Sequence, residues 1–158
     1  MRKETIELEK LRQRIAILDW EATDLAEQLE REKPSGKKLK SAEERKAQLG
    51  AEIKKLMAEL HDLIAKGPRE AVEEWVNWHK AELDEIIRSE PDDGANTRLG
   101  MARFVLAGWD KVLKGEQDFV RINKYFLKEY VAKAEQTFPK DEVATQKEAK
   151  KSSWKFWE

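Results

Sequence analysis

The sequence contains no cysteine and no long apolar run. The absence of cysteine excludes disulfides, thiol catalysis and thiolate metal sites. No apolar stretch approaches the roughly 20 residues that a membrane-spanning helix needs. Residues 1–4 lead directly into a regular helical pattern rather than into a secretory signal. We therefore expect a soluble protein of the cytoplasm that has no membrane partner.

Common enzyme patterns are missing as well. Gly36-Lys37-Lys38 lacks the earlier glycine and the strand of a phosphate-binding loop, and no Gly-x-Ser-x-Gly elbow occurs. His61 and His79 fall in different predicted helices, without the carboxylate spacing of known histidine metal motifs. A catalytic carboxylate pair needs burial to separate its pKa values, and no acid stands clearly on an apolar face. We predict a protein that is not an enzyme and uses no cofactor or metal.

Charge is abundant but nearly balanced. Charged residues make up 40% of the chain, with 31 basic and 32 acidic side chains. The net charge is −3 in residues 1–32, +4 in 33–67 and −6 in 68–96. Because acidic and basic segments alternate, neighbouring helices can complement one another. A protein that coats nucleic acid would usually be strongly basic, so the composition does not favour that class.

Two stretches show apolar residues at alternating intervals of three and four, the repeat of a coiled-coil seam. The first seam comprises Leu8, Leu11, Ile15, Leu18, Ala22, Leu25 and Leu29. The second comprises Leu39, Ala42, Lys46, Leu49, Ile53, Leu56, Leu60 and Leu63, with Lys46 as its single break. Residues whose numbers add up to 71 pair core position with core position, and the midpoint falls in Ser35-Gly36. This symmetry predicts an antiparallel helical hairpin with a turn over residues 33–38.

Three further helices are expected. Gly67-Pro68 predicts a sharp corner, because Gly favours the end of a helix and Pro the start of the next. The third helix is predicted to reach Ser89, and a Pro-Asp-Asp-Gly loop separates it from a fourth over 97–114. A fifth is predicted to start after Gly115 and to reach about Gln136. Their apolar faces suffice to form a small three-helix unit, in which His79 would be a structural core histidine.

The sequence thus predicts an all-α protein with three parts. These are a coiled-coil hairpin (1–67), a three-helix domain (68–138) and a flexible tail (139–158) that ends in an aromatic motif. The predicted function is a protein–protein interaction module, such as an adaptor, assembly factor or inhibitor. A homo-oligomer is expected too, because hairpins often pair into four-helix bundles.

The candidate protein-binding residues are apolar side chains outside the predicted seams and faces. Ile17 and Trp20 lie opposite the first seam, and Phe104 lies opposite the apolar face of its helix. Trp154, Phe156 and Trp157 form the aromatic terminal motif. Trp is a common interface anchor. Two alternatives remain: these residues pack against the chain itself, or they contact another protein.

The alternative function is that of a nucleic-acid-binding regulator or packaging-type factor. It would use a basic hairpin turn and a basic stripe with an interleaved tyrosine on the fifth helix, because lysine and arginine contact phosphates and aromatic rings stack on bases. The residues concerned are Lys33, Lys37, Lys38, Lys40, Arg121, Lys124, Tyr125 and Lys128. Solvated helix faces would show the same pattern. The sequence names neither the partner nor the pathway.

Overall fold

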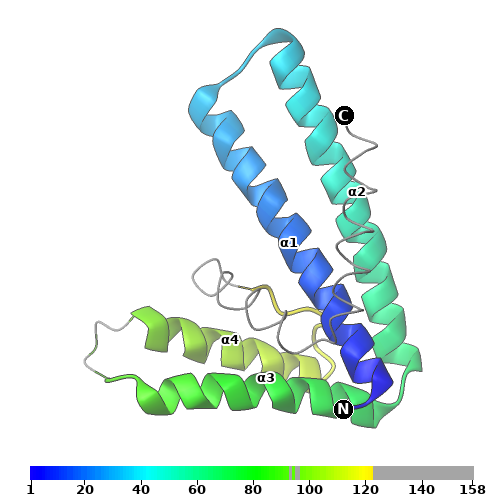
Figure 1. Ribbon diagram of the computed structural model, residues 1–158, viewed down its shortest axis with the longest axis vertical. Coiled ribbons are helices and arrows are strands. Elements are labelled where there is room, and N and C mark those ends of the chain that lie inside the picture. Colours follow the sequence, from blue (N-terminus) through cyan, green and yellow to red (C-terminus); the bar gives the residue numbers. More distant parts are fainter. Residues whose placement is uncertain (93, 95–96, 123–158) are drawn as a thin grey trace. The chain divides into compact units, whose positions relative to one another are not determined.

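The computed structural model describes residues 1–92, 94 and 97–122, and this part of the chain contains helices and no strand. The four helices are α1 (Lys3–Glu32), α2 (Gly36–Lys66), α3 (Arg69–Ser89) and α4 (Thr97–Leu113) (Figure 1). The predicted all-α class is confirmed. The described residues all lie in one compact unit, Met1–Asn123. The predicted domain boundaries stay predictions.

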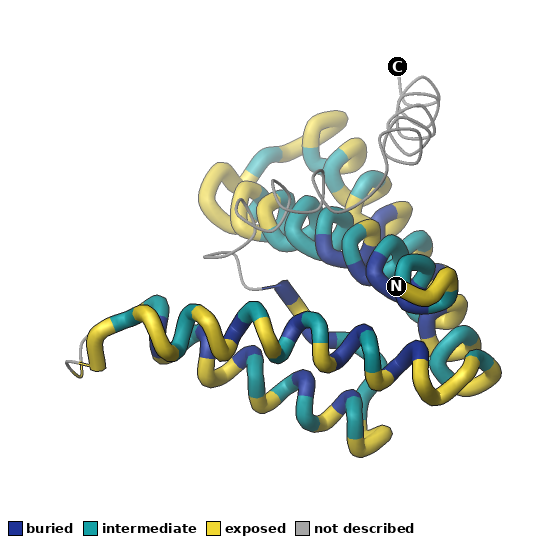
Figure 2. The backbone as a smooth tube through the Cα atoms, turned by 60° about the horizontal axis from the view of Figure 1, so that its bottom comes forward, coloured by how far each residue is buried: buried dark blue, intermediate teal, exposed yellow. Residues whose placement is uncertain are grey.

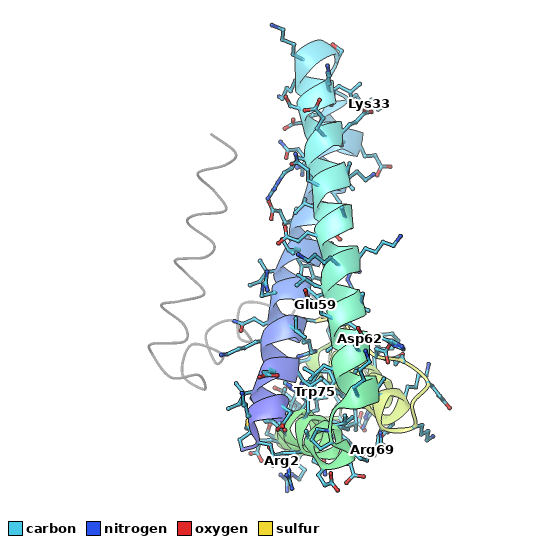
Figure 3. The ribbon with its side chains drawn as sticks, turned by 90° about the vertical axis from the view of Figure 1, so that its right-hand side faces the viewer. Arg2, Lys33, Glu59, Asp62, Arg69 and Trp75 are labelled. Atoms are coloured by element: carbon cyan, nitrogen blue, oxygen red, sulfur yellow. The ribbon has the colours of Figure 1, made fainter. Side chains whose placement is uncertain are left out.

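Short connections join the first three helices. Residues 33–35 link α1 to α2, and Lys33 takes a left-handed φ of 45° while its N–H donates to the Leu29 carbonyl at 3.0 Å. Between α2 and α3, the N–H of Gly67 donates to the Leu63 carbonyl at 2.9 Å, and Pro68 precedes the first residue of α3. The predicted corner at Gly67-Pro68 is confirmed. Figure 3 shows Lys33 at one end of the α1–α2 pair, with Arg2 and Arg69 at the other.

α1 and α2 contact each other, and burial along the two helices is uneven (Figure 2). The buried seam residues are Leu8 and Ile15 of α1 with Leu49, Leu56 and Leu60 of α2. Ion pairs beside the seam join Arg14 to Glu52 at 3.8 Å and Glu21 to Arg45 at 2.5 Å. Lys46, which breaks the pattern, is exposed.

α3 and α4 bury their predicted faces against each other. Trp75 and Trp109 are 0% and 1% exposed, and their rings meet edge to face with centroids 4.9 Å apart. Edge-to-face contact places the positive ring edge against the negative face of its neighbour, which adds to the gain from burial. The start of α4 at Thr97 and the end of α3 at Ser89 match the predicted boundaries.

The predicted fifth helix is wrong at its start. Residues 116–122 form no helix, and the remainder of the predicted helix lies outside the described residues. Val120 and Ile122 are buried while Arg121 between them is exposed, an alternation typical of extended chain. Side chains from α1 donate hydrogen bonds to two carbonyls of this segment, those of Val120 and Ile122. The segment therefore packs against the helices without helical hydrogen bonds of its own.

Candidate functional site

α1 carries a second stripe of residues beside its apolar seam, which we call the polar stripe. Its members are spaced alternately by four and three, like the seam itself: Thr5, Glu9, Arg12, Ala16, Asp19 and Thr23. Thr5 donates to the Ala71 carbonyl of α3 at 3.1 Å, and Ala16 is 1% exposed. Asp19 and Thr23 both contact Arg121. The seam thus faces α2, whereas the polar stripe faces α3 and the segment after α4.

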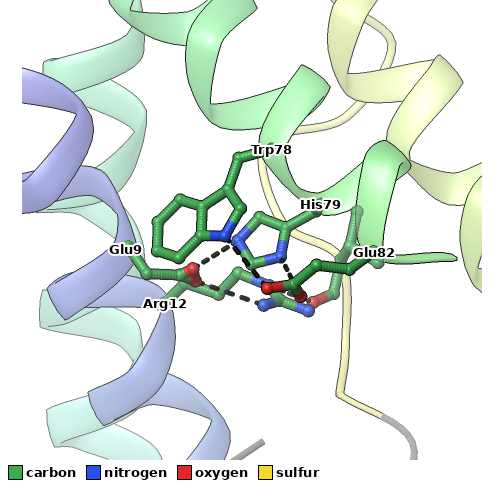
Figure 4. A network of polar contacts seen from close by, with 6 residues as sticks. Glu9, Arg12, Trp78, His79 and Glu82 are labelled. Carbon is green, nitrogen blue, oxygen red and sulfur yellow. Dashed lines mark hydrogen bonds and ion pairs between the residues drawn. The ribbon is translucent and has the colours of Figure 1, made fainter. Parts of the chain in front are cut away.

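Three charged or titratable side chains at the centre of this contact are buried. Glu9 is 1% exposed, Arg12 3% and His79 of α3 4%. The Glu9 carboxylate contacts His79 Nε2 through one oxygen and accepts from Arg12 at 3.2 Å through the other (Figure 4). An ionised carboxylate can only accept, so Nε2 of His79 carries the proton in this contact. Arg12 Nε donates to the Val120 carbonyl at 3.0 Å, which ties α1 to the segment after α4.

Aromatic rings enclose the imidazole of His79. It stacks on Trp109 with centroids 4.4 Å apart and on Trp78 with centroids 4.7 Å apart, at interplanar angles of 8° and 20°. Its Nδ1 lies 3.8 Å from a carboxylate oxygen of Glu82, and the guanidinium of Arg12 lies 4.6 Å above the Trp109 ring. Flat cations next to electron-rich ring faces gain electrostatic attraction. The cluster is therefore a charged core held by aromatic packing.

This enclosure limits what the cluster can do chemically. Both faces of the imidazole are covered by indoles, Nε2 is held by Glu9, and Glu82 lies beside Nδ1. A substrate would have to displace one of these groups before it reached a ring nitrogen. Among the described residues, no group of three His, Asp or Glu side chains is placed to hold a metal ion. The geometry suits a structural clamp between α1, α3 and Val120.

Trp20 and Arg121, predicted as surface residues for partners, contact each other. The indole N–H of Trp20 donates to the Ile122 carbonyl at 2.7 Å, and the Arg121 guanidinium lies 4.4 Å above the indole ring. Arg121 also binds Asp19 and donates to Thr23 Oγ1 at 2.8 Å. For Trp20, these contacts favour the alternative of packing against the chain itself. Arg121 stands in extended chain, so the predicted helical stripe does not include it.

Two exposed ion contacts shift pKa values. His61 Nδ1 lies 2.5 Å from Asp118, and this hydrogen bond and the Asp118 charge raise the pKa of His61. The backbone N–H of Arg2 donates to Glu74 at 2.7 Å, which lowers the pKa of the Glu74 carboxyl. Both contacts join residues far apart in the chain. The His61 contact links α2 to the segment after α4, and the Arg2 contact links the start of α1 to α3.

The remaining predicted site residues are scattered. Phe104 on α4 is 77% exposed, and Ile17 on α1 is half-buried. Lys33, Lys37, Lys38 and Lys40 are exposed near the connection between α1 and α2, where Lys38 pairs with Glu32 at 3.5 Å. The other predicted residues, Trp154, Phe156, Trp157, Lys124, Tyr125 and Lys128, lie outside the described part of the chain. The structure therefore brings none of the predicted sets together in full.

One long stretch contains no buried residue. From Ile17 to Gln48, every side chain is half-buried or exposed (Figure 2). Apart from the exposed Lys46, the seam residues of this stretch, among them Leu25, Leu29 and Leu39, are only half-buried. We call residues 17–48 the unburied segment. The seam continues through it, but the protein's own described helices do not cover it as they cover the rest.

Reasoning from the sequence missed the buried cluster. The sequence pattern predicts no acid on an apolar face, whereas Glu9 is buried, with Arg12 buried beside it. The polar stripe has the same spacing as the seam, and this spacing is the available signal for a second buried face. The signal is weak because Ala16 is the only apolar member of the stripe. No helix of the described chain is long and apolar enough to cross a membrane. Compared with known proteins, the chain matches no family model, no curated protein and no solved structure.

Proposed function

We propose that this chain is a non-enzymatic protein–protein interaction module that presents α1 and α2 as an antiparallel coiled-coil hairpin. A helical domain and a tail with the motif Trp154-Lys155-Phe156-Trp157 would follow it. The observation that carries the proposal is the unburied segment: 32 successive residues with none buried, although they include regularly spaced leucines.

The unburied segment offers apolar surface that a partner helix could cover. Most helical stability in proteins comes from packing an apolar face rather than from helix propensity. The half-buried Leu25, Leu29 and Leu39 leave part of that face without cover. Burial of a leucine contributes on the order of 2 kcal/mol. A helical partner laid on the segment would gain from covering it, while exposed charges on both sides would set its orientation.

The enclosed cluster gives catalysis little support, because His79 has no open ring face or nitrogen. Nucleic-acid binding is the second candidate, and the exposed Lys33, Lys37 and Lys40 favour it. However, Lys38 pairs with Glu32, and Arg121 is bound by Asp19 and Thr23. The cationic groups available to phosphates are therefore fewer than the sequence suggests.

The test is affinity capture with the full chain as bait, with and without nuclease, from a lysate of the source organism. Captured proteins are identified, purified and titrated against the full chain, a chain ending at Phe138, and Glu30→Lys in the unburied segment. We expect a nuclease-resistant protein whose binding is weakened by Glu30→Lys. Recovery of nucleic acid alone, with binding that falls steeply as salt rises, would replace the proposal with the second candidate.

A further inference from the structure

The polar stripe of α1 continues beyond the residues that cover it. After Asp19 and Thr23, which contact Arg121, the same spacing reaches Ala26 and Glu30. Ala26 is half-buried and Glu30 is exposed. α3 and the segment after α4 thus occupy this face only as far as Thr23. In the described part of the chain, the next two turns of the same face, at Ala26 and Glu30, contain no buried residue.

The matching face of α2 has similar properties. Placed in the same repeat, Lys40, Glu43 and Ala47 of α2 lie beside the seam on the face that Ala26 and Glu30 share, and all three are exposed. The alanines are small enough to let another helix approach closely. The face is therefore flat at its centre and charged toward the α1–α2 connection.

The charges on this face of α1 and α2 make it self-complementary, with an acidic strip beside a basic one. Residues 21–32 carry five acids and one arginine, a net charge of −4, whereas residues 33–46 carry six bases and two acids, a net charge of +4. The two strips lie side by side on α1 and α2. In the register in which residue numbers add up to 71, Glu30 pairs with Ser41, the neighbour of Lys40, so Glu30 and Lys40 are expected at nearly the same height on the two helices.

A two-fold interface places the same surface on both partners, so it must complement itself. If the axis runs parallel to the helices, α1 of one copy faces α2 of the other, and each Glu30 meets the Lys40 of the second copy. An axis across the helices would instead bring acidic α1 against acidic α1. Charge therefore selects the first arrangement, with both α1–α2 connections at the same end.

We infer that the unburied segment binds the same segment of a second copy, in a two-fold four-helix pairing with Glu30 opposite Lys40. This rests on the proposed function and names its partner. The half-buried leucines would be covered in the interface, which combines an apolar centre with charged edges. It also gives a reason why so long a seam lacks cover from the described part of the chain.

The first experiment is sedimentation equilibrium of the full chain and of Glu30→Lys and Lys40→Glu. The full chain should sediment at twice its mass of 18.5 kDa. Each variant should raise the dimer dissociation constant at least about tenfold, because two attractive pairs become two like-charge pairs. An equimolar mixture of the two variants should regain dimers, since lysine then faces glutamate at both positions.

Glu27→Lys is the matched control, because it makes the same charge change on the same helix at an exposed position opposite the seam. It should leave the dissociation constant within about twofold, and circular dichroism should show unchanged helix content in all variants. A monomeric full chain at every accessible concentration overturns the inference. A dimer whose dissociation constant changes with neither Glu30→Lys nor Lys40→Glu also overturns it, as does an equimolar mixture of these two variants that stays monomeric.

Failure of the self-pairing can be distinguished from failure of the proposed function. A monomeric chain that still loses a captured, purified partner with Glu30→Lys would overturn the self-pairing and keep the interaction module. A monomeric chain without any protein partner would overturn both.

Discussion

At the scale of single residues, the buried cluster of Glu9, Arg12 and His79 makes α1 dependent on α3. Glu9 is the shared acceptor, since its two oxygens contact Arg12 and His79 separately. Replacing buried ions by apolar groups of similar volume is often neutral, but removing one partner leaves a charge uncompensated. The cluster therefore adds little net stability, but any other placement of α1 would leave buried charges uncompensated and would cost free energy.

We predict that Glu9→Gln lowers the free energy of unfolding by about 3–5 kcal/mol, because the buried Arg12 guanidinium loses its counter-charge. Chemical denaturation measures the change. Glu27→Gln removes an exposed acid from the same helix, and it should change the stability by no more than about 0.5 kcal/mol. Equal effects of the two substitutions would contradict the role assigned to Glu9.

The contact between His61 and Asp118 should make stability depend on pH. The pKa of His61 is raised in the folded protein, and it is about 6.5 in the unfolded chain. Its contribution is thus fully present below pH 6.5 or so and is lost as pH rises through the folded pKa. NMR titration should show His61 titrating at a lower pH in Asp118→Asn than in the wild type. The difference in free energy of unfolding between the two proteins should narrow as pH rises above the pKa of His61 in the folded wild type. Asp62→Asn is the control, because Asp62 contributes least to the shift.

At the scale of elements, the corner between α2 and α3 depends on Gly67. A Cβ added there would lie 2.5 Å from the Leu63 carbonyl oxygen, a backbone atom that cannot move away alone. At Gly100 in α4, a Cβ would meet no atom within 4 Å. We predict that Gly67→Ala destabilises the fold by about 1–3 kcal/mol, whereas Gly100→Ala stabilises it by about 0.5–1 kcal/mol. Thermal unfolding of both variants checks the pair, and a stabilising Gly67→Ala would refute the argument.

Elements with strong periodicity were predictable from the sequence, and the contacts between elements were not. The seams, the corner at Gly67-Pro68 and the boundary at Ser89 follow from local spacing and turn chemistry. The sequence predicts a helix over residues 116–122 because Phe119, Val120 and Ile122 begin an apolar face that continues at helical intervals after them. Their structure instead depends on distant donors, Arg12 for the Val120 carbonyl and Trp20 for that of Ile122. Such long-range hydrogen bonds leave no periodic signal in the segment that accepts them.

At the scale of the whole unit, burial divides α1 and α2 into two parts with different expected dynamics. Residues 5–16 and 49–60 contain the buried seam and the polar contacts to α3, and residues 17–48 contain no buried side chain. Local opening costs less free energy where fewer apolar contacts must be broken. The amides of the unburied segment should therefore exchange faster than those of Leu8, Ile15 or Leu56.

Self-pairing of the unburied segment adds a second expectation, because binding protects the amides it covers and depends on concentration. Hydrogen exchange followed by mass spectrometry at low and high protein concentration should show protection rising in residues 24–46, with α3 unchanged. Glu30→Lys should exchange quickly there at both concentrations, and Glu27→Lys should behave as wild type. Uniform protection along α1 at every concentration would show that the unburied segment is as stable as the buried core, and that its exposed seam requires no partner.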